Sequence, residues 1–277
     1  MYVGVDVSQH QLPWEELLRR VRFAEDAGFA SVWVFDHFTP LYGDPEGPCL
    51  EAWTLLAALA ASTARVRLGV LVTGVTYRHP SLLAAEAVTV DHVSGGRLDL
   101  GIGAAWFEAE HRRLGFDFPP TGERIDRLEE HLQIVTALLA GADRPFTGRT
   151  YRLEQTRYRP LPVQRPHPPI WIGASGERRM LPLVARHADV WHSFGSPDDL
   201  ARKSALLDGM AREAGRDPAA IARSTSLSLS EPWDELRATV DRLRGVGVSS
   251  LIASWPAEGW PRIEELADKV LPDLAAA

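Results

Sequence analysis

The sequence contains one cysteine, two lysines and no dense basic run, and each shortage disfavours a class of protein. The single Cys49 has no partner for an internal disulfide and cannot form a cysteine-rich zinc module, which fits a reducing compartment. The two lysines, Lys203 and Lys269, fall in predicted helices away from strand ends. A barrel aldolase or isomerase with a Schiff-base lysine is therefore disfavoured.

Long apolar runs are also missing. Residues 55–61 form the most apolar stretch, which is far too short to span a bilayer. Residues 1–6 show no basic segment followed by an apolar one, so we expect no signal peptide and a cytoplasmic protein. The 30 Lys and Arg against 37 Asp and Glu give a net charge of −7. This charge offers no basic surface to nucleic acid or to an anionic membrane, and neither partner is expected.

The sequence does contain a strand followed by a helix, repeated eight times over 277 residues. The predicted strands are residues 2–7, 31–35, 66–72, 97–101, 169–172, 189–192, 222–229 and 249–253. Eight such units favour a closed (β/α)8 TIM-like barrel of the α/β class, forming one domain over residues 1–277. A dinucleotide-binding open sheet is disfavoured, because the loop at residues 8–11 has no glycine.

The regular spacing of the strands breaks once. Strands that start near 2, 31, 66 and 97 are followed by the next one only near 169. Residues 104–168 are therefore predicted to hold an insertion between strands 4 and 5. It would contain an amphipathic helix over residues 121–140 and a hairpin over residues 146–153. We expect this insertion to cover the mouth of the barrel.

The active site of such a barrel lies at its C-terminal mouth, so polar residues that directly follow a strand are the first candidates. Asp36 and His37 follow the second strand. A histidine is suited to proton transfer near neutral pH, and an adjacent carboxylate can orient nearby groups, which favours a catalytic pair. The same two residues would also serve as an ordinary strand-end cap.

The loop after the fourth strand combines small and aromatic residues. Gly103 and Ala104 are small enough to let a planar ligand approach the backbone, and Trp106 and Phe107 would wall a pocket. A plain turn followed by a core tryptophan fits the same residues.

Gly173, Ala174, Ser175 and Gly176 lead from the fifth strand into a helix predicted to start at residue 177. Glycines and a hydroxyl residue at a helix N-terminus leave backbone N–H groups free, which is typical of a phosphate site. Ser175 or Gly176 would also be ordinary helix caps.

Other reactive patterns are incomplete. Glu108 and His111 have the spacing of a metal-binding pair, but no second pair accompanies them, so no metal site is predicted. The sequence has no Gly-x-Ser-x-Gly turn and no catalytic cysteine context, which argues against the common covalent hydrolases.

Five segments together resemble the luciferase-like monooxygenase superfamily and cover nearly the whole chain in the same order. They read AEDAGF at residues 24–29, VWVFDH at 32–37, RLGVLVTGVTYRHP at 67–80, DHVSGGRLDLGIG at 91–103 and PPIWIGASGERRMLPLVARHAD at 168–189. Within the superfamily, the chain is most similar to the branch that uses coenzyme F420, an 8-hydroxy-5-deazaflavin.

The resemblance implies a homodimeric barrel that holds the deazaflavin in its mouth, with the cofactor phosphate on residues 173–176. It implies that His37 lies by the cofactor ring as the proton-handling residue, with Asp36 as its neighbour. It also implies a bulge with a non-prolyl cis peptide between Leu71 and Val72 behind the ring. Residues 71–73, including Thr73, would contact the cofactor together with residues 103 and 104.

The chain departs from the sugar-phosphate dehydrogenases of this branch at two positions. Trp106 stands where those enzymes have a glutamate, and Leu41 stands where they have an aromatic residue against the substrate. The carboxylates Glu108 and Glu110 come too late in the sequence to align with that glutamate. Sugar-phosphate oxidation is therefore rejected and no second proton donor is assigned. Leu41, Trp106 and Phe107 are predicted to line the substrate pocket.

We therefore predict an F420-dependent oxidoreductase that transfers a hydride between C5 of the deazaflavin and a small organic substrate. An activated C=C or C=N bond or a secondary alcohol would fit the apolar lining of the mouth. One alternative is an FMN-dependent monooxygenase or flavin reductase on the same scaffold. Another is a non-catalytic flavin-binding protein of this fold.

Overall fold

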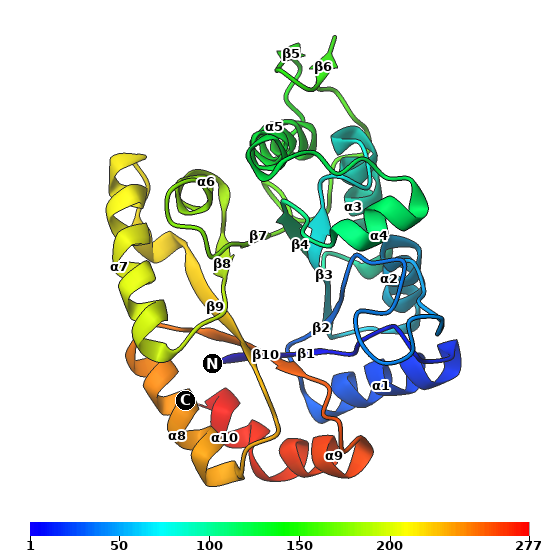
Figure 1. The fold of residues 1–277 in the computed structure, drawn as a ribbon, viewed down its shortest axis with the longest axis vertical. Helices are drawn as coiled ribbons and strands as arrows, with labels where there is room; N and C mark the ends of the chain where they lie inside the picture. Colours follow the sequence, from blue (N-terminus) through cyan, green and yellow to red (C-terminus); the bar gives the residue numbers. More distant parts are fainter. Residues whose placement is uncertain (277) are drawn as a thin grey trace.

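Eight parallel strands close into a barrel in a computed structural model that describes residues 1–276. Around the barrel the strands follow the order β1-β10-β9-β8-β7-β4-β3-β2, and each pairs in parallel with its neighbours. Figure 1 looks into the C-terminal mouth, with the helices outside the ring of strands. The predicted (β/α)8 barrel is confirmed.

The strands lie where the sequence predicts them, within a few residues. The barrel strands are β1 (Tyr2–Asp6), β2 (Ser31–Val34), β3 (Arg67–Gly74), β4 (Leu98–Gly103), β7 (Ile170–Gly173), β8 (Val190–His192), β9 (Ala222–Leu227) and β10 (Ser250–Ser254). A separate antiparallel hairpin consists of β5 (Phe146–Thr147) and β6 (Arg152–Leu153), as predicted for residues 146–153.

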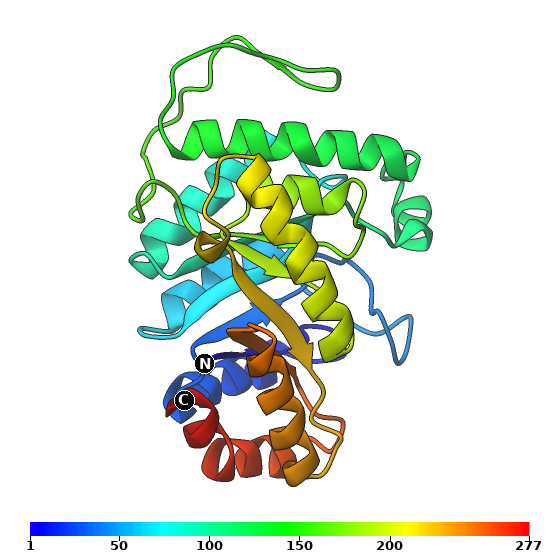
Figure 2. The same cartoon turned by 90° about the vertical axis from the view of Figure 1, so that its left-hand side faces the viewer.

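The helices form the outer layer of the barrel (Figures 1 and 2). They are α1 (Trp14–Ala27), α2 (Ala52–Ser62), α3 (Pro80–Ser94), α4 (Glu108–Leu114), α5 (Thr121–Leu139), α6 (Met180–His187), α7 (Pro197–Glu213), α8 (Trp233–Gly245), α9 (Trp260–Lys269) and α10 (Leu271–Ala276). A short 3-10 turn, Pro218–Ala220, precedes β9. Both chain termini lie on the side opposite the mouth.

Helix α1 shows how local sequence sets these elements. Its buried side chains Leu17, Val21 and Ala24 recur at helical spacing and form one face against the barrel. Gly28 ends the helix in the left-handed conformation at φ 86°, which glycine adopts without steric cost. The apolar face and the C-cap at Gly28 together determine the length of the helix.

The inside of the barrel is filled by two large aromatic rings. Trp33 of β2 and Trp171 of β7 lie with ring centroids 4.5 Å apart and are almost fully buried. A Cβ atom on Gly4 of β1 would lie 2.9 Å from Trp33 Nε1, and one on Gly69 of β3 would overlap the ring. These glycines therefore provide the space that the central tryptophan occupies.

The segment between β4 and β7 divides into parts with different positions. Helix α4 lies beside the strand ends, whereas the β5–β6 hairpin lies beyond α5, away from the barrel (Figures 1 and 2). The Glu130 carboxylate of α5 holds the hairpin turn by accepting the N–H groups of Arg149, Thr150 and Tyr151. The expectation that the whole segment covers the mouth is therefore wrong for the hairpin.

Candidate active site

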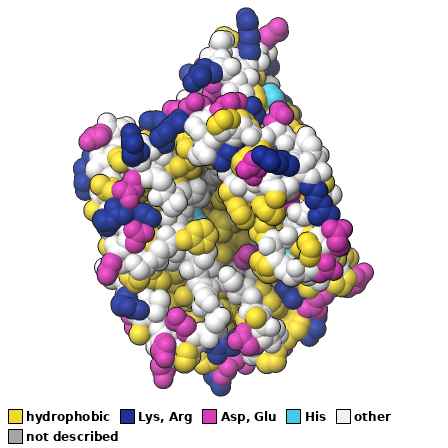
Figure 3. All heavy atoms as spheres, viewed as in Figure 1, with side chains coloured by type: hydrophobic (Ala, Val, Ile, Leu, Met, Phe, Trp, Pro, Cys, Tyr) yellow, Lys and Arg dark blue, Asp and Glu magenta, His cyan; other side chains and the backbone are white. Residues whose placement is uncertain are grey.

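The mouth is the hollow in the face that Figure 3 shows, and hydrophobic side chains form much of its wall. Its floor consists of the inward-facing residues at the C-terminal ends of the strands. Because loops after parallel strands converge at this end, residues far apart in sequence meet here.

His37 follows β2 and is held by a carboxylate that comes from α4. His37 Nδ1 lies 3.0 Å from Glu110 Oε2. The other oxygen of Glu110 accepts the backbone N–H groups of Phe38 at 2.8 Å and Thr39 at 2.9 Å. Glu110 therefore fixes both the imidazole ring and the loop that carries it.

The charge of Glu110 is stabilised although the residue is buried. Burial opposes ionisation, but hydrogen bonds from His37 and from the Tyr77 hydroxyl outweigh it and lower the pKa of Glu110 to about 2. Burial and the bond to Glu110 raise the pKa of the Tyr77 hydroxyl, which stays a donor. Glu110 is thus a permanent anion behind His37.

Aromatic rings surround the imidazole of His37. Trp106 and Phe107 approach it edge-on with centroids 5.7 and 5.8 Å away, and Phe35 lies 5.7 Å away. Since Nδ1 is bonded to Glu110, Nε2 is the nitrogen left to exchange a proton with a ligand. This geometry suits a base or acid in a mostly apolar pocket.

Asp36 is bound to the loop after β3, whereas His37 is bound to α4. It is buried, and Arg78 donates to both of its oxygens, at 2.6 and 3.0 Å. The N–H of Gly74 also donates to it, at 2.8 Å. These bonds tie the end of β2 to the loop between β3 and α3, so Asp36 positions the site without facing the open mouth.

One wall of the mouth is built from a bulge in β3 and two glycines. The register of β3 against β4 shifts between Val70 and Thr73, and the peptide between Leu71 and Val72 is cis, as predicted. A Cβ atom on Gly173 would lie 3.3 Å from both methyl carbons of Val72, and one on Gly103 would lie 2.5 Å from one of them. The bulge and both glycines therefore lie side by side.

Three of the predicted cofactor contacts have their polar groups engaged elsewhere. Thr73 is fully buried, and its hydroxyl accepts the Trp53 indole N–H at 3.1 Å. The carbonyl of Ala104 accepts Arg124 Nε at 3.1 Å. Ala174 donates its N–H to the His192 carbonyl at 3.0 Å. These bonds engage one polar group of each residue within the protein.

The loop after β7 presents unused backbone donors. Within the described residues, no hydrogen bond starts from the N–H groups of Ser175, Gly176 or Glu177. Helix α6 begins at Met180, three residues later than predicted, and a turn over residues 177–179 precedes it. The exposed Ser175 and Gly176 directly precede this turn, and their free N–H groups suit an anion.

The predicted substrate residues lie on the rim. Trp106 is 65% exposed and stacks on Phe107 with a centroid distance of 5.2 Å. Leu41 is partly exposed in the loop after β2. The exposed rings of Tyr42 and Phe194, which follow β2 and β8, were not predicted.

Three polar residues of the site also escaped the sequence analysis. Glu110 was set aside because it does not align with the glutamate of the sugar-phosphate dehydrogenases, but α4 turns back toward β2 and brings it to His37. Asp6 and His192 end β1 and β8. The sequence analysis treated both only as strand residues. Side chains alternate between the two faces of a strand, and this alternation would have predicted that Asp6 and His192 face the inside of the barrel near its mouth.

His192 is buried and neutral. Burial lowers its pKa to about 4, and its ring nitrogens lie 3.0 Å from the Ser224 hydroxyl and 3.4 Å from that of Ser226. Both serines come from β9, so this side of the mouth is polar but carries no positive charge from histidine.

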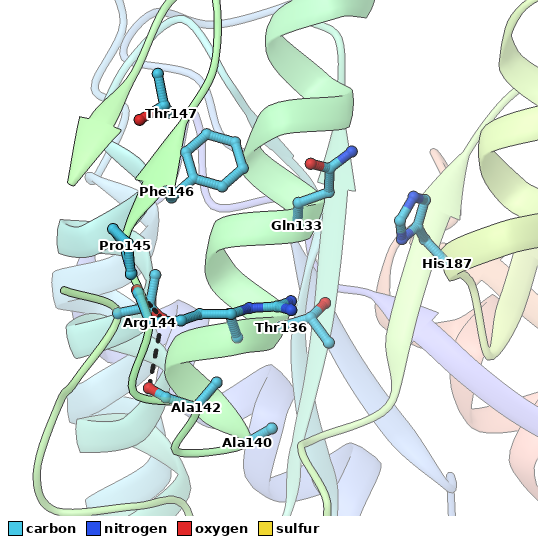
Figure 4. A pocket seen from close by; sticks show the side chains of 11 residues that line it. Gln133, Thr136, Ala140, Ala142, Arg144, Pro145, Phe146, Thr147 and His187 are labelled. Atoms are coloured by element: carbon cyan, nitrogen blue, oxygen red, sulfur yellow. Dashed lines mark hydrogen bonds between the residues drawn. The ribbon is translucent and has the colours of Figure 1, made fainter. Parts of the chain in front are cut away.

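A further cavity of about 570 Å3 lies outside the barrel (Figure 4). It is bounded by α5, by the loop that leads into β5 and by His187 at the end of α6. Gln133 of α5 and His187 point toward each other across it (Figure 4). Because it contacts none of the barrel strand ends, it is separate from the mouth.

The described residues offer neither a metal site nor a membrane-spanning helix. They contain no group of three His, Cys, Asp or Glu side chains arranged to hold a metal ion. His111, which has metal-like spacing from Glu108, instead stacks on Tyr77 and bonds the Thr76 hydroxyl at 2.7 Å. No helix over residues 1–276 is both long and apolar enough to cross a bilayer.

The structure is a closed (β/α)8 barrel. Its mouth holds a histidine bonded to a carboxylate, and its third strand is bulged. The loop after β7 has free backbone N–H groups. Comparison with known proteins gives the family. The profile of the luciferase-like monooxygenase family matches residues 2–258. The chain belongs to the luciferase-like monooxygenase family, as predicted.

Two curated relatives differ in the cofactor that they use. The chain is 32% identical over 227 residues to the F420-dependent hydroxymycolic acid dehydrogenase of Mycobacterium tuberculosis, covering 81% of this chain and 61% of that relative. It therefore spans less than two thirds of that protein. It is 34% identical over 169 residues to the oxygenase component of the flavin-dependent trigonelline monooxygenase of Acinetobacter baylyi, covering 60% and 44%.

Solved structures share the fold at low identity. An F420-dependent secondary alcohol dehydrogenase in complex with an F420-acetone adduct has a TM-score of 0.87 and 18% identity, covering 97% of this chain and 98% of that one. The EDTA monooxygenase of Chelativorans sp. BNC1 has a TM-score of 0.86 and 14% identity, covering 100% and 93%. At these identities the likeness establishes the barrel and leaves the cofactor open.

Proposed function

We propose that the protein is a coenzyme F420-dependent oxidoreductase that transfers a hydride between C5 of the deazaflavin and a small organic substrate. The observation that carries this proposal is the His37–Glu110 pair, which lies among aromatic rings at the mouth of the barrel. The F420-dependent dehydrogenase among the relatives, which aligns over 81% of the chain, supports it.

The residues on one wall fit a planar cofactor. Leu71 and Val72 of the β3 bulge face Gly103 and Gly173, and a side chain on either glycine would fill the space beside Val72. The free N–H groups of Ser175, Gly176 and Glu177 suit the cofactor phosphate. We therefore expect the ring to lie on this wall and the phosphate on the loop.

When bound, the deazaflavin supplies or accepts the hydride. The chain handles the accompanying proton. His37 accepts a proton at Nε2 when an alcohol is oxidised and donates one when a double bond is reduced, while Glu110 stabilises the charged imidazolium. Trp106 and Phe107 exclude water from one side of the imidazole and orient the substrate. Activated C=C or C=N bonds and secondary alcohols are the substrates that this arrangement favours.

An FMN-dependent monooxygenase is the second candidate function. The 34% identity to the oxygenase component of a flavin-dependent monooxygenase favours it, since that relative is as similar as the dehydrogenase over the part aligned. A non-catalytic flavin-binding protein would keep the wall formed by the β3 bulge, Gly103 and Gly173, and the loop after β7. It would not need the His37–Glu110 pair. We also propose that the protein is cytoplasmic and forms a homodimer. Sedimentation analysis would test the oligomeric state.

The loop after β7 offers a direct test of the cofactor site. A Cβ atom on Gly176 would meet only ordinary contacts with Met180, at 3.6 Å or more, so this position accepts a side chain. Gly176→Asp places a negative charge beside the phosphate, and Gly176→Asn is its matched neutral control. We expect the Asp variant to lose F420 affinity at least tenfold relative to the Asn variant. Equal affinities would overturn the placement of the phosphate.

A further inference from the structure

Asp6 is an acidic residue on the floor of the mouth that the proposed reaction does not use. Even-numbered residues of β1 face the inside of the barrel, because Tyr2 bonds Asp99 and a Cβ atom on Gly4 would touch Trp33 and Ile252. Val3 and Val5 belong to the core between the strands and the helices. Asp6, at the C-terminal end of β1, therefore points into the mouth.

Within the described residues, Ser8 is the one hydrogen-bond partner of the Asp6 carboxylate. Its Oδ1 accepts the backbone N–H of Ser8 at 2.8 Å and lies 3.5 Å from the Ser8 hydroxyl. Among the described residues, Oδ2 accepts no hydrogen bond, and no Lys, Arg or His nitrogen lies within 4 Å of either oxygen. The side chain is partly exposed, so its free oxygen opens toward the hollow.

Asp99, a second carboxylate inside the barrel, is paired with an arginine, in contrast to Asp6. Asp99, at the closed end, receives two hydrogen bonds from Arg67, at 2.7 and 3.0 Å, and one from the Tyr2 hydroxyl at 3.1 Å. Asp6 has no such cation. A carboxylate deep in a protein without a counter-ion is costly, and burial raises the pKa of Asp6 to about 6.

The cation that most influences Asp6 is already engaged. Arg20 bonds the Val7 carbonyl at 3.3 Å and Glu16 at 3.4 Å, and its guanidinium lies 4.3 Å over the Trp255 ring. His192, across the floor, is neutral. Arg20 therefore acts on Asp6 only from a distance, and within the described residues the Asp6 carboxylate has no direct ion-pair partner.

The rim of the mouth carries exposed aromatic rings, which favour a positively charged ligand. Tyr42, Trp106 and Phe194 are each more than 60% exposed and follow three different barrel strands. Aromatic faces attract organic cations, above all when a carboxylate lies nearby. The free carboxylate and the exposed rings thus favour a ligand that is apolar in its body and positively charged at one point.

We propose that Asp6 binds a positively charged nitrogen of the substrate, so that the enzyme acts on hydrophobic organic cations such as protonated amines, iminium ions or pyridinium rings. The reaction assigned to such a substrate rests on the proposed function, whereas the charge preference rests on the residues of the mouth alone. A cationic C=N group would place its charge at Asp6 and its apolar part under the aromatic rim.

Three probes of similar size and different charge test this proposal. Benzylammonium, benzyl alcohol and benzoate are titrated calorimetrically at pH 8 into the full-length protein, with and without oxidised F420. We expect benzylammonium to bind at least tenfold more tightly than benzyl alcohol, and benzoate to bind least tightly. In Asp6→Asn the benzylammonium preference falls about tenfold, while the affinity for benzyl alcohol stays within about twofold.

Asp44→Asn is the matched control, since it removes the same charge from an exposed loop after β2 and should keep the full preference. The thermal unfolding of both variants is recorded, and binding of benzyl alcohol shows that the mouth is intact. Equal benzylammonium preference in wild type and Asp6→Asn would overturn the proposal, even if F420 binds. If F420 fails to bind but Asp6→Asn still abolishes the preference, the charge assignment stands and the proposed cofactor is wrong.

Discussion

The imidazole of His37 depends on one carboxylate for its orientation. Glu110 lies 3.0 Å from Nδ1 and also holds the backbone on both sides of Phe38. An anion in this position orients the ring and fixes its tautomer, so that Nε2 is left to face a ligand. We therefore propose Glu110 as a positioning residue that acts on proton transfer through His37.

Glu110→Gln tests this role. Glutamine keeps the acceptor for Phe38 and Thr39 but removes the charge behind His37, so we expect the rate of F420-linked turnover to fall about tenfold to a hundredfold. The dissociation constant of F420, measured by titration, should stay within about twofold. Glu108→Gln on the same helix removes only an exposed pair with Arg112 and serves as control. Equal rates in the two variants would contradict the role of Glu110.

Asp6 gives a prediction about stability and pH. Its folded pKa of about 6 lies above the unfolded value near 4, so its contribution to stability is complete below about pH 4 and is lost as the pH rises through 6. Asp6→Asn does not suffer this loss. Because Asp6 is partly exposed, we expect the variant to be more stable than wild type by on the order of 1 kcal/mol at pH 8 and not at pH 4.

Urea unfolding at the two pH values measures this difference. Arg20, the charged group that acts on Asp6, keeps its charge throughout this range. An advantage of Asp6→Asn that is the same at pH 4 and pH 8 would show that the carboxylate does not titrate as described.

Some residues of the site follow from sequence position and others do not. Asp36 and His37 follow a buried strand, and that position alone makes them candidates. Glu110 lies 73 residues from His37, and no local pattern joins them. Their contact depends on how α4 turns back from β4, which is a property of the tertiary structure.

At the scale of the strand, glycine marks where backbones come close. A Cβ atom on Gly101 of β4 would overlap the Val70 carbonyl oxygen, which is backbone and cannot move aside cheaply. Gly209 lies in α7 with nothing within 4 Å of such an atom. The same substitution should therefore have opposite effects at the two positions.

Gly101→Ala is expected to lower the free energy of unfolding by about 2 kcal/mol or more, because it overpacks the β3–β4 contact beside the bulge. Gly209→Ala should raise it by about 0.5–1 kcal/mol, since alanine is the better helix former. Denaturant unfolding of both variants measures the two values. A Gly101→Ala protein as stable as wild type would show that β3 and β4 pack less closely than described.

Elements were predictable where periodicity is strong and less so at their ends. The apolar spacing of α1 and α5 and the buried runs of the strands identify those elements from the sequence alone. The start of α6 was placed at residue 177, but the chain makes a turn over residues 177–179 first. Glycines at 173 and 176 permit either conformation, so local sequence does not decide between them.

At the scale of the whole molecule, the mouth has two unlike sides. The β3, β4 and β7 ends form a wall of small and apolar residues around Val72. The β8, β9 and β1 ends provide His192, two serines and Asp6. A flat cofactor and a polar substrate group can thus be bound on opposite sides, with His37 at the edge of the mouth.

The barrel itself was predictable because eight strand–helix units admit few other closed arrangements. The separation of the hairpin from the mouth was not, because it depends on which face of α5 carries Glu130. The identity of the cofactor is a property of the whole mouth, and the relatives include users of both F420 and flavin.

The central claim is that this mouth binds a deazaflavin. The most direct test is an equilibrium titration of the wild-type protein with oxidised F420 and, in parallel, with FMN, followed by the fluorescence of each cofactor. We predict saturable binding of one F420 per chain with clearly higher affinity than FMN. Tighter binding of FMN would contradict the claim and favour a monooxygenase, and binding of neither would leave the barrel without its proposed cofactor.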